Sequence, residues 1–479
     1  MELIGREKEI RSLTNCFTSD KSEFVAVYGR RRVGKTFLVK ELFGDKFIFY
    51  STGILDGNKD VQLQAWNNEI SRYGGSGFAE AKNWFEAFEN LNLLVERSAK
   101  QSGAGTYTNP KKVIFLDEIP WMATMHSGFL AGLDYFWNRW ASSRKDVMLI
   151  ICGSAASWIT DNITNNRGGL HNRLTRQILM EPFNLKECEQ YFLSRRIPMT
   201  RYQMAEAYMI FGGIPYYLSL MEPRYSLYQN VDAMYFAKGA ELGNEFENLY
   251  RSLYRNAENY VSVIEALAKR GIGLSQTEIA GSSQISDGGN LTKILSDLCI
   301  SGFVRKYKAY GRKKKDSLYQ LIDFFSLFDI RFCEKRVSQA TDYWLRFSST
   351  PAYYTWRGLS YEKLCLLHLP QIRKKIGISG VLTGAYSWKG EYEGQGAQVD
   401  LVIDREDNII NLCEIKFSSG LYQIDKDDHL SMRNKRSAFK DSTHTRKSVV
   451  TTMITTFGLT KNEYSGEIMS EVTLDDLFE

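Results

Sequence analysis

The segment GRRRVGKT, residues 29–36, has the spacing of a loop that binds phosphate groups. It matches G-x-x-x-x-G-K-[ST], in which glycines let backbone N–H groups wrap the phosphates, a lysine reaches the β- and γ-phosphates, and a hydroxyl ligates Mg²⁺. The segment lies between the strand-like FVAVY and the helix-like TFLVKELF, a context that disfavours a chance Gly-Lys turn. The residues predicted to bind ATP, with Lys35 also catalytic and Thr36 also a Mg²⁺ ligand, are Gly29, Arg30, Arg31, Arg32, Val33, Gly34, Lys35, Thr36 and Phe37.

Two further apolar runs end in residues that suit the same chemistry. VIFLDE ends with Asp117, which can hold the Mg²⁺ shell, and Glu118, which can activate a water for hydrolysis. VMLIICGS ends in Ser154, a polar residue that could read the γ-phosphate. Beyond it, Arg173 and Arg176 are candidates for stabilising charge in the transition state. Acids at strand ends and arginines on a surface helix are also common without any catalytic role.

The hairpin-like segment AQVDLVIDREDNIINLCEIKF, residues 397–417, contains a second set of reactive side chains. Glu414 and Lys416 are two residues apart on a predicted strand, so they share one face. Asp400 joins them on that face if the turn holds an odd number of residues. Two carboxylates with a lysine suit Mg²⁺ or Mn²⁺ and phosphodiester chemistry. The alternative is an exposed strand face on which charges occur by chance.

The order of predicted helices and strands indicates where both sets of candidate site residues lie. From about residue 24, short apolar runs alternate with helical patterns, which predicts a parallel α/β sheet with ligands beyond the carboxyl ends of its strands. A helix-rich stretch follows after about residue 185. Residues 258–322 read as three short helices and a basic hairpin, the pattern of a winged helix. A helix-like sequence pattern begins at about residue 336 and continues to the terminal hairpin.

The predicted wing is rich in basic residues, which suits non-specific contact with DNA phosphates. These residues are Arg305, Lys306, Lys308, Arg312, Lys313, Lys314 and Lys315. The predicted recognition helix, residues 290–299, has only Lys293 as a basic residue, which is poor for reading bases. A spacer, a protein-docking module or a solvated hairpin tip therefore stays an alternative.

The composition is that of an ordinary globular protein of about three domains. The 479 residues are 43% hydrophobic and 24% charged, and the net charge of +5 permits binding of nucleic acid without arguing for it. No apolar stretch approaches the ~18 residues of a membrane span. The seven Cys form no C-x-x-C pair and lie mostly in apolar runs. We expect a cytoplasmic protein that contacts no membrane.

Several motifs together resemble the prokaryotic, archaeal-type ATPases of the AAA+/STAND-like group. They are LIGREKEIRSL, GRRRVGKT, FLDEIPW, CGS followed by R-L-T-R, and FGGIPYYL. The resemblance implies that Gly5 and Arg6 lie near the adenine, that Ser154 senses the γ-phosphate and that Arg173 is the arginine finger, within one chain or across a homo-oligomer. FGGIPYYL lacks the second sensing arginine of many relatives, which argues against ring-type cooperative hydrolysis and leaves a slow, switch-like ATPase open.

The C-terminal part resembles the PD-(D/E)xK nuclease-like domain that follows this ATPase in the family. The resemblance adds Glu362 to Asp400 and Glu414 as a metal-site residue, with Lys416 catalytic. It places Gln398 nearby and makes Lys435 an accessory candidate. Val399 stands where the motif has its proline, a departure that removes no ligand.

Motifs and resemblance together predict an α/β fold in four parts. These are a P-loop ATPase core with a parallel sheet at 1–184, a helical lid at 185–255, a winged helix at 256–335 and a restriction-endonuclease-like α/β domain at 336–479. We expect an ATPase whose nucleotide state controls DNA binding and metal-dependent cleavage. The alternative is an ATP-controlled switch that binds DNA or protein without cutting.

Overall fold

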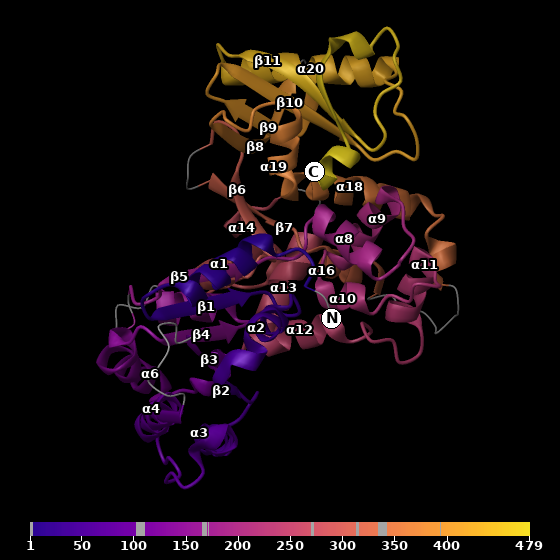
Figure 1. The fold of residues 1–479 in the computed structure, drawn as a ribbon. Coiled ribbons are helices and arrows are strands. Elements are labelled where there is room, and N and C mark those ends of the chain that lie inside the picture. The colour runs from indigo at the N-terminus through magenta and orange to yellow at the C-terminus, as the bar shows by residue number, and fades with distance from the viewer. Residues whose placement is uncertain are drawn as a thin grey trace. The chain divides into compact units, whose positions relative to one another are not determined.

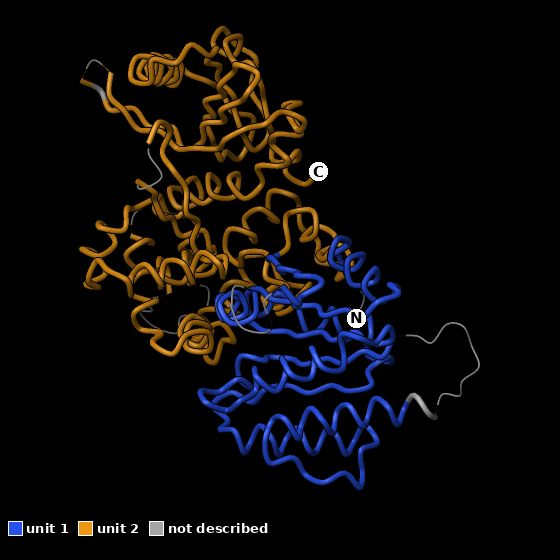
Figure 2. Tube along the Cα trace, turned by 90° about the vertical axis from the view of Figure 1, so that its left-hand side faces the viewer, with its two compact units in different colours: residues 1–182 blue, residues 183–479 orange. Residues whose placement is uncertain are grey.

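The structure, a computed structural model, describes residues 3–101, 111–164, 170, 172–269, 273–312, 316–333, 343–392 and 394–479. The chain forms two compact units, residues 1–182 and 183–479 (Figures 1 and 2). The first boundary lies two residues from the predicted end of the ATPase core at 184. The other three predicted parts lie in the second unit, and the boundaries between them stay predictions.

The first unit is built on a five-stranded parallel sheet. Its strands are β1 (Glu23–Gly29), β2 (Phe47–Thr52), β3 (Lys112–Asp117), β4 (Val147–Gly153) and β5 (Arg176–Met180). Their order is β2-β3-β4-β1-β5. The runs FVAV, VIFL and VMLIIC are buried because helices cover the sheet, as the near-continuous apolar sequence predicts.

The helices of the first unit are α1 (Glu7–Thr18), α2 (Lys35–Phe43), α3 (Lys59–Ile70), α4 (Trp84–Gln101), α5 (Ile119–Met122), α6 (Phe129–Arg139) and α7 (Ala156–Ile159). Aromatic side chains of α3, α4 and α6, among them Trp66, Trp84 and Phe136, pack in one core with strand residues such as Phe49 and Leu149. These aromatic side chains therefore form the core faces of the three helices.

The strand order brings the predicted site residues together. β4 pairs with β1 on one side and with β3 on the other. Because all three are parallel, their carboxyl ends meet at one edge of the sheet. The loop after β4 therefore emerges between the phosphate loop after β1 and the acidic end of β3.

The second unit begins with α8 (Leu185–Ser194), α9 (Arg201–Phe211), α10 (Pro215–Ser219), α11 (Leu227–Val231) and α12 (Glu245–Leu253). Capping boxes start α8 at Asn184, α9 at Thr200 and α11 at Ser226. α9 ends at Gly212, whose φ of 72° favours glycine. This stretch is helical, as predicted from its sequence.

Three helices and an antiparallel hairpin follow. They are α13 (Ala257–Ala268), α14 (Gln276–Ser283), α15 (Gly289–Ile300), β6 (Val304–Lys308) and β7 (Ser317–Leu321). This order of elements agrees with the predicted one, and the assignment as a winged helix stays a prediction. Lys313, Lys314 and Lys315 of the predicted wing lie outside the described residues.

The rest of the second unit contains a mixed five-stranded sheet of order β12-β11-β10-β9-β8. Its strands are β8 (Thr383–Tyr392), β9 (Gln395–Arg405), β10 (Ile409–Lys416), β11 (Ser448–Thr455) and β12 (Ile468–Thr473), and the helices of this region are α16 (Phe324–Phe328), α17 (Tyr343–Phe347), α18 (Pro351–Leu367), α19 (Leu369–Lys375) and α20 (Lys426–Thr443). Phe439 of α20 packs on Trp388, Val402 and Ile410 of the sheet. The predicted α/β class is confirmed: a parallel sheet in the first unit and a second sheet in the C-terminal region.

Candidate functional site

The phosphate loop starts at the carboxyl end of β1 and ends in the first turn of α2. Gly29 has φ 142°, and a Cβ there would lie 2.3 Å from the carbonyl oxygen of Met180, so only glycine fits. Gly34, with φ 91°, turns the chain into α2, where Leu38 N–H bonds the Gly34 carbonyl. The loop therefore has the shape that the motif predicts, with the N-terminus of α2 at its end.

Lys35 lies inside this loop. Its side chain is buried, with 5% of the residue exposed, and its ammonium donates to the carbonyl oxygens of Gly29 at 3.0 Å and Arg30 at 2.8 Å. Both acceptors belong to the loop that would wrap a phosphate chain. The ammonium is thus within the phosphate-binding loop, as predicted.

Thr36 and Asp117 come from different elements and meet at the edge of the sheet. The Thr36 hydroxyl donates to Asp117 Oδ2 at 2.8 Å. Burial raises the pKa of Asp117, and the hydrogen bond from Thr36 opposes that rise. One hydroxyl and one carboxylate are the protein ligands that fit Mg²⁺, which keeps water and phosphate oxygens as its other ligands.

Glu118 follows β3 and is held by Ser154. Its backbone is in the left-handed region, with φ 46° and ψ 49°. Glu118 Oε2 accepts from the Ser154 N–H at 3.0 Å, and Oε1 accepts from the Ser154 hydroxyl at 2.5 Å. The sequence named both residues, but the bond between them depends on the loop after β4 lying beside the end of β3.

Arg6 also belongs to this neighbourhood. It is buried, and its Nη2 donates to the carbonyl oxygen of Val33 in the phosphate loop at 3.2 Å. Gly5 and Arg6 both have φ 64°. The structure thus brings the N-terminal segment against the loop, while their contact with adenine stays a prediction.

Arg173 and Arg176 lie at the opposite edge of the sheet. Arg176 is the first residue of β5 and pairs with Val25 near the start of β1. The interpretation without a catalytic role had placed it on a surface helix. The Thr175 N–H donates to the Phe24 carbonyl at 2.8 Å. The five residue-to-residue steps from Phe24 to Gly29 span about 16 Å of strand. Arg173 is exposed two residues before Thr175, remote from the phosphate loop of its own chain.

The second set of reactive residues lies around β9 and β10. Their antiparallel register pairs Cys413 with Leu401, so one residue further along it sets Glu414 opposite Asp400. The turn thus satisfies the predicted condition of an odd number of residues. The Gln398 amide donates to Asp400 Oδ1 at 2.8 Å.

Glu414 is compensated by lysines. Lys435 Nζ lies 2.7 Å from Glu414 Oε2, and Lys416 Nζ lies 3.4 Å from Glu414 Oε1 and 3.3 Å from Asp428. Burial alone lowers the pKa of Lys416, but the charge of Glu414, with Tyr422 and Asp428, outweighs it and raises that pKa. Lys435, expected as an accessory, is the nearest partner of Glu414.

Glu362 of α18 completes the predicted set. Burial raises its pKa to about 8, and the charges of Asp400 and Glu414 add to that rise. Within the part of the chain that the structure describes, however, no three His, Cys, Asp or Glu side chains are grouped to hold a metal ion. Glu362, Asp400 and Glu414 are thus not grouped as ligands among the described residues; lysines pair with Glu414, and the Gln398 amide bonds Asp400.

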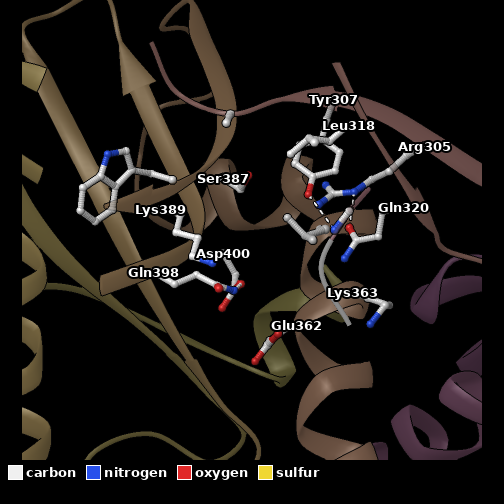
Figure 3. A pocket seen from close by; sticks show the side chains of 14 residues that line it. Arg305, Tyr307, Leu318, Gln320, Glu362, Lys363, Ser387, Lys389, Gln398 and Asp400 are labelled. Carbon is white, nitrogen blue, oxygen red and sulfur yellow. Dashed lines mark hydrogen bonds between the residues drawn. The ribbon is translucent and has the colours of Figure 1, made fainter. Parts of the chain in front are cut away.

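A cavity of about 590 Å³, including its part open to solvent, lies beside these acids (Figure 3). Asp400 lines it from β9, Glu362 from α18 and Arg305 from the hairpin β6–β7. The Arg305 Nε donates to Gln320 at 2.7 Å. Arg305 was expected on a basic wing, and the structure places it in β6 at this cavity. Lys363 and Lys389 also line the cavity, and their isolated positions in the sequence gave no signal.

The remaining basic residues of the predicted DNA-binding region differ in environment. Lys306 and Arg312 are exposed, and Lys308 is half-buried. Lys293, the basic residue of α15, is paired with Asp297 at 2.7 Å. Among the described helices, none is long and apolar enough to cross a membrane.

Comparison with known proteins shows what the N-terminal part of the chain resembles. Residues 3–221 match the family described as an ATPase domain predominantly from Archaea. The chain is 23% identical over 422 residues to the uncharacterized protein MJECL04 of Methanocaldococcus jannaschii, covering 86% of this chain and 87% of that protein.

Solved structures with a related arrangement include the Walker-type ATPase PABY2304 of Pyrococcus abyssi, with 18% identity and TM-score 0.47, covering 69% of this chain and 96% of that one. The ORC2 protein of Aeropyrum pernix has 13% identity and TM-score 0.40, covering 69% and 93%. The family match contains the phosphate loop, Asp117, Glu118 and Ser154. By this match, residues 3–221 are similar to ATPase domains found predominantly in Archaea.

Proposed function

We propose that this ATPase uses its nucleotide state to control a C-terminal site that binds DNA and cleaves phosphodiester bonds. The coupling and the cleavage go beyond the ATPase assignment. The proposed ATP hydrolysis rests on one observation: Ser154 holds Glu118 through two hydrogen bonds.

Each residue of the ATPase site has a distinct task. The N–H groups of the phosphate loop and the ammonium of Lys35 bind and orient the phosphates. Thr36 and Asp117 hold the metal shell, and bound Mg²⁺ would offset the charge that develops on phosphate oxygens. Glu118 accepts a proton from the attacking water. Ser154 fixes the Glu118 carboxylate, so the base is positioned before the substrate arrives.

The position of Arg173 supports a role toward a second copy of the chain. It lies at the edge of the sheet away from its own phosphate loop, so it can reach only a nucleotide held by a neighbour. Mixing Arg173→Ala with Lys35→Ala chains tests this. Each variant alone would be inactive, and mixed oligomers would regain part of the ATPase activity; no recovery would contradict the assignment.

The C-terminal half of the proposal rests on the Asp400–Glu414 register and on Lys416. Asp400 and Glu414 would hold a divalent ion only after Glu414 gave up a lysine contact, and such an ion would polarise a phosphoryl oxygen. Lys416 then stabilises charge on the reacting phosphate. Gln398 orients Asp400 through its amide hydrogen bond.

A switch without cleavage is the second candidate, and one observation favours it. Glu414 already has two ammonium partners, which neutralise the carboxylate that a metal ion would need. In that function, the C-terminal unit binds DNA or protein under the control of the ATPase and breaks no bond.

Two assays separate these functions. Steady-state ATP hydrolysis by the wild type, Lys35→Ala and the exposed control Lys145→Ala tests the first site. Loss in Lys35→Ala alone is expected, and unchanged turnover would refute the nucleotide site. Nicking of plasmid DNA with Mg²⁺ or Mn²⁺ and ATP tests the second. Nicking lost in Glu414→Ala and Lys416→Ala but kept in Glu406→Ala supports cleavage; no nicking under any condition supports the switch.

A further inference from the structure

We propose that the hairpin β6–β7 is one wall of the C-terminal site and that Arg305, with Lys363 and Lys389, binds the phosphate of a nucleotide-sized segment of nucleic acid there. The proposal deepens the proposed function and rests on it for the reaction at Asp400. The binding itself does not depend on cleavage.

The hairpin is docked on the C-terminal sheet. The Tyr310 N–H, just after β6, donates to the Ser387 carbonyl of β8 at 2.7 Å. The Tyr310 ring packs on Phe439 of α20 with centroids 4.9 Å apart, and on Tyr386 at 5.5 Å. β8 is the outer strand of its sheet, and the hairpin meets this edge through a bridge between Ala309 and Ser387. These contacts turn the hairpin toward the sheet and leave its side chains beside the cavity.

Three elements surround the cavity. Figure 3 shows Arg305 and Gln320 across from Asp400 and Lys389, with Glu362 between these two sides. A ligand beside Asp400 would therefore contact the hairpin as well as the sheet. This arrangement makes the hairpin part of the site.

The cationic side chains are placed to bind an anion. Lys363 has 5% of its surface exposed, and its ammonium makes one hydrogen bond among the described residues, to the Leu359 carbonyl at 3.3 Å. An ammonium has three donors, and burying its charge with only one hydrogen-bond acceptor costs free energy of folding. A phosphate in the cavity would supply the missing acceptors.

Arg305 is held in a fixed orientation. Its Nε bonds Gln320, and its guanidinium lies over the Tyr307 ring, 4.3 Å from the centroid. A guanidinium has five donors, and Gln320 and Tyr307 engage only part of them, so the others can donate to a phosphate. Lys389, on the facing strand, adds a second cation from the opposite wall.

The size of the cavity indicates what can enter. Much of the 590 Å³ is open to solvent, and the enclosed space is about 100 Å³, the room of a few water molecules, which a phosphate group would fill. With the hairpin docked beside β8, a space of this size suits the phosphate of a free nucleotide or of a flexible strand better than the side of a duplex. The ligand class is thus a nucleotide phosphate, from either a single strand or a free nucleotide.

Binding of a short 3′-fluorescent, 5′-phosphorylated oligothymidylate to the full-length protein, in EDTA and without ATP, tests this. Fluorescence anisotropy should show affinity falling at least about tenfold in Arg305→Ala and in Lys389→Gln. Arg305→Lys should recover part of the affinity, and the exposed control Arg224→Ala should stay within about twofold of the wild type. Competition by free thymidylate, and the same oligonucleotide as a duplex, distinguish the ligand's source.

Stronger binding of the duplex than of the single strand would overturn the proposal. So would equal losses in Arg305→Ala and Lys306→Ala, because a free basic wing predicts them. Unchanged affinity in Arg305→Ala and Lys389→Gln would do the same. Thermal melting shows whether each variant is folded. Since no metal is present, Arg305-dependent binding can persist in a protein that never nicks plasmid, so failure of cleavage and failure of this proposal are separate results.

Discussion

The two candidate sites hold their carboxylates in different ways. Asp117 and Glu118 of the first unit accept hydrogen bonds from the hydroxyls of Thr36 and Ser154. Glu414 of the second unit is paired with the ammonium groups of Lys416 and Lys435. A hydroxyl leaves the negative charge uncompensated, whereas an ammonium neutralises it. The first site can therefore accept a divalent cation directly. In the second site, Glu414 must lose a lysine contact before it can bind such a cation.

The largest expected effect concerns the base of the first site. Glu118→Gln should lower ATP turnover about 1000-fold, or about 4 kcal/mol, because an amide cannot accept the proton. Nucleotide affinity should stay near that of the wild type, since Glu118 does not bind the phosphates. Steady-state hydrolysis and titration with a fluorescent ATP analogue measure the two quantities. A parallel loss of affinity and turnover would mean that Glu118 shapes the pocket instead.

Acidification should destabilise the second unit through His368. The His368 Nδ1 bonds the Leu364 carbonyl at 2.8 Å at the end of α18, and its Nε2 accepts from Leu185 N–H at 3.1 Å. Burial lowers its pKa from the usual 6.5 of histidine to about 4. Between these two pKa values the unfolded chain binds a proton that the folded chain does not bind. The free energy of unfolding should therefore fall by about 3 kcal/mol as the pH drops from about 6.5 to 4.

Denaturant unfolding at several pH values checks this expectation. His368→Gln removes the titrating group and should flatten the decline between pH 6.5 and pH 4. If wild type and variant lost stability in parallel, other groups would be responsible.

A smaller effect should follow removal of the hydroxyl that holds Glu118. Ser154→Ala keeps the backbone N–H bond to Glu118 and loses the hydroxyl bond, so turnover should fall about tenfold, or about 1.4 kcal/mol. Ser143→Ala, which removes a serine hydroxyl elsewhere in the same unit, is the matched control. Turnover equal to that of the wild type would show that Ser154 does not position the base.

The smallest expected effect concerns the lysines of the second site. Lys435→Met should raise the affinity for Mn²⁺ about fivefold, because Glu414 loses its nearest ammonium and leaves more negative charge for the ion. Calorimetric titration of full-length protein without nucleotide measures this, with the exposed Lys440→Met on the same helix as control. Weaker Mn²⁺ binding in Lys435→Met would show that the lysine supports the ion and does not compete with it.

Much of the first site could be predicted because its parts are continuous in sequence. GRRRVGKT contains its own glycines, lysine and hydroxyl, and the apolar runs before Asp117 and Ser154 identified two strand ends. The strand order, which brings Ser154 beside Glu118, came only from the structure. No local pattern states which strand lies between which others.

The second site was predictable to a lesser extent. Alternation along β9 and β10 gave the shared face of Asp400 and Glu414, because side chains on a strand repeat every two residues. The pairing of Glu414 with Lys435 depends on how α20 packs on the sheet. The place of Arg305 depends on docking between segments about 80 residues apart, through Tyr310 and Ser387.

The sequence by itself determined the chemistry that each short segment can perform: a phosphate loop, an acidic strand end, and a strand pair with two carboxylates and a lysine. The tertiary structure decided which charges meet. Local spacing fixes the conformation and facing of a segment, but the electrostatic partners of a side chain come from packing between distant elements. For that reason the same residue types form a hydroxyl-bonded site in one unit and a lysine-compensated one in the other.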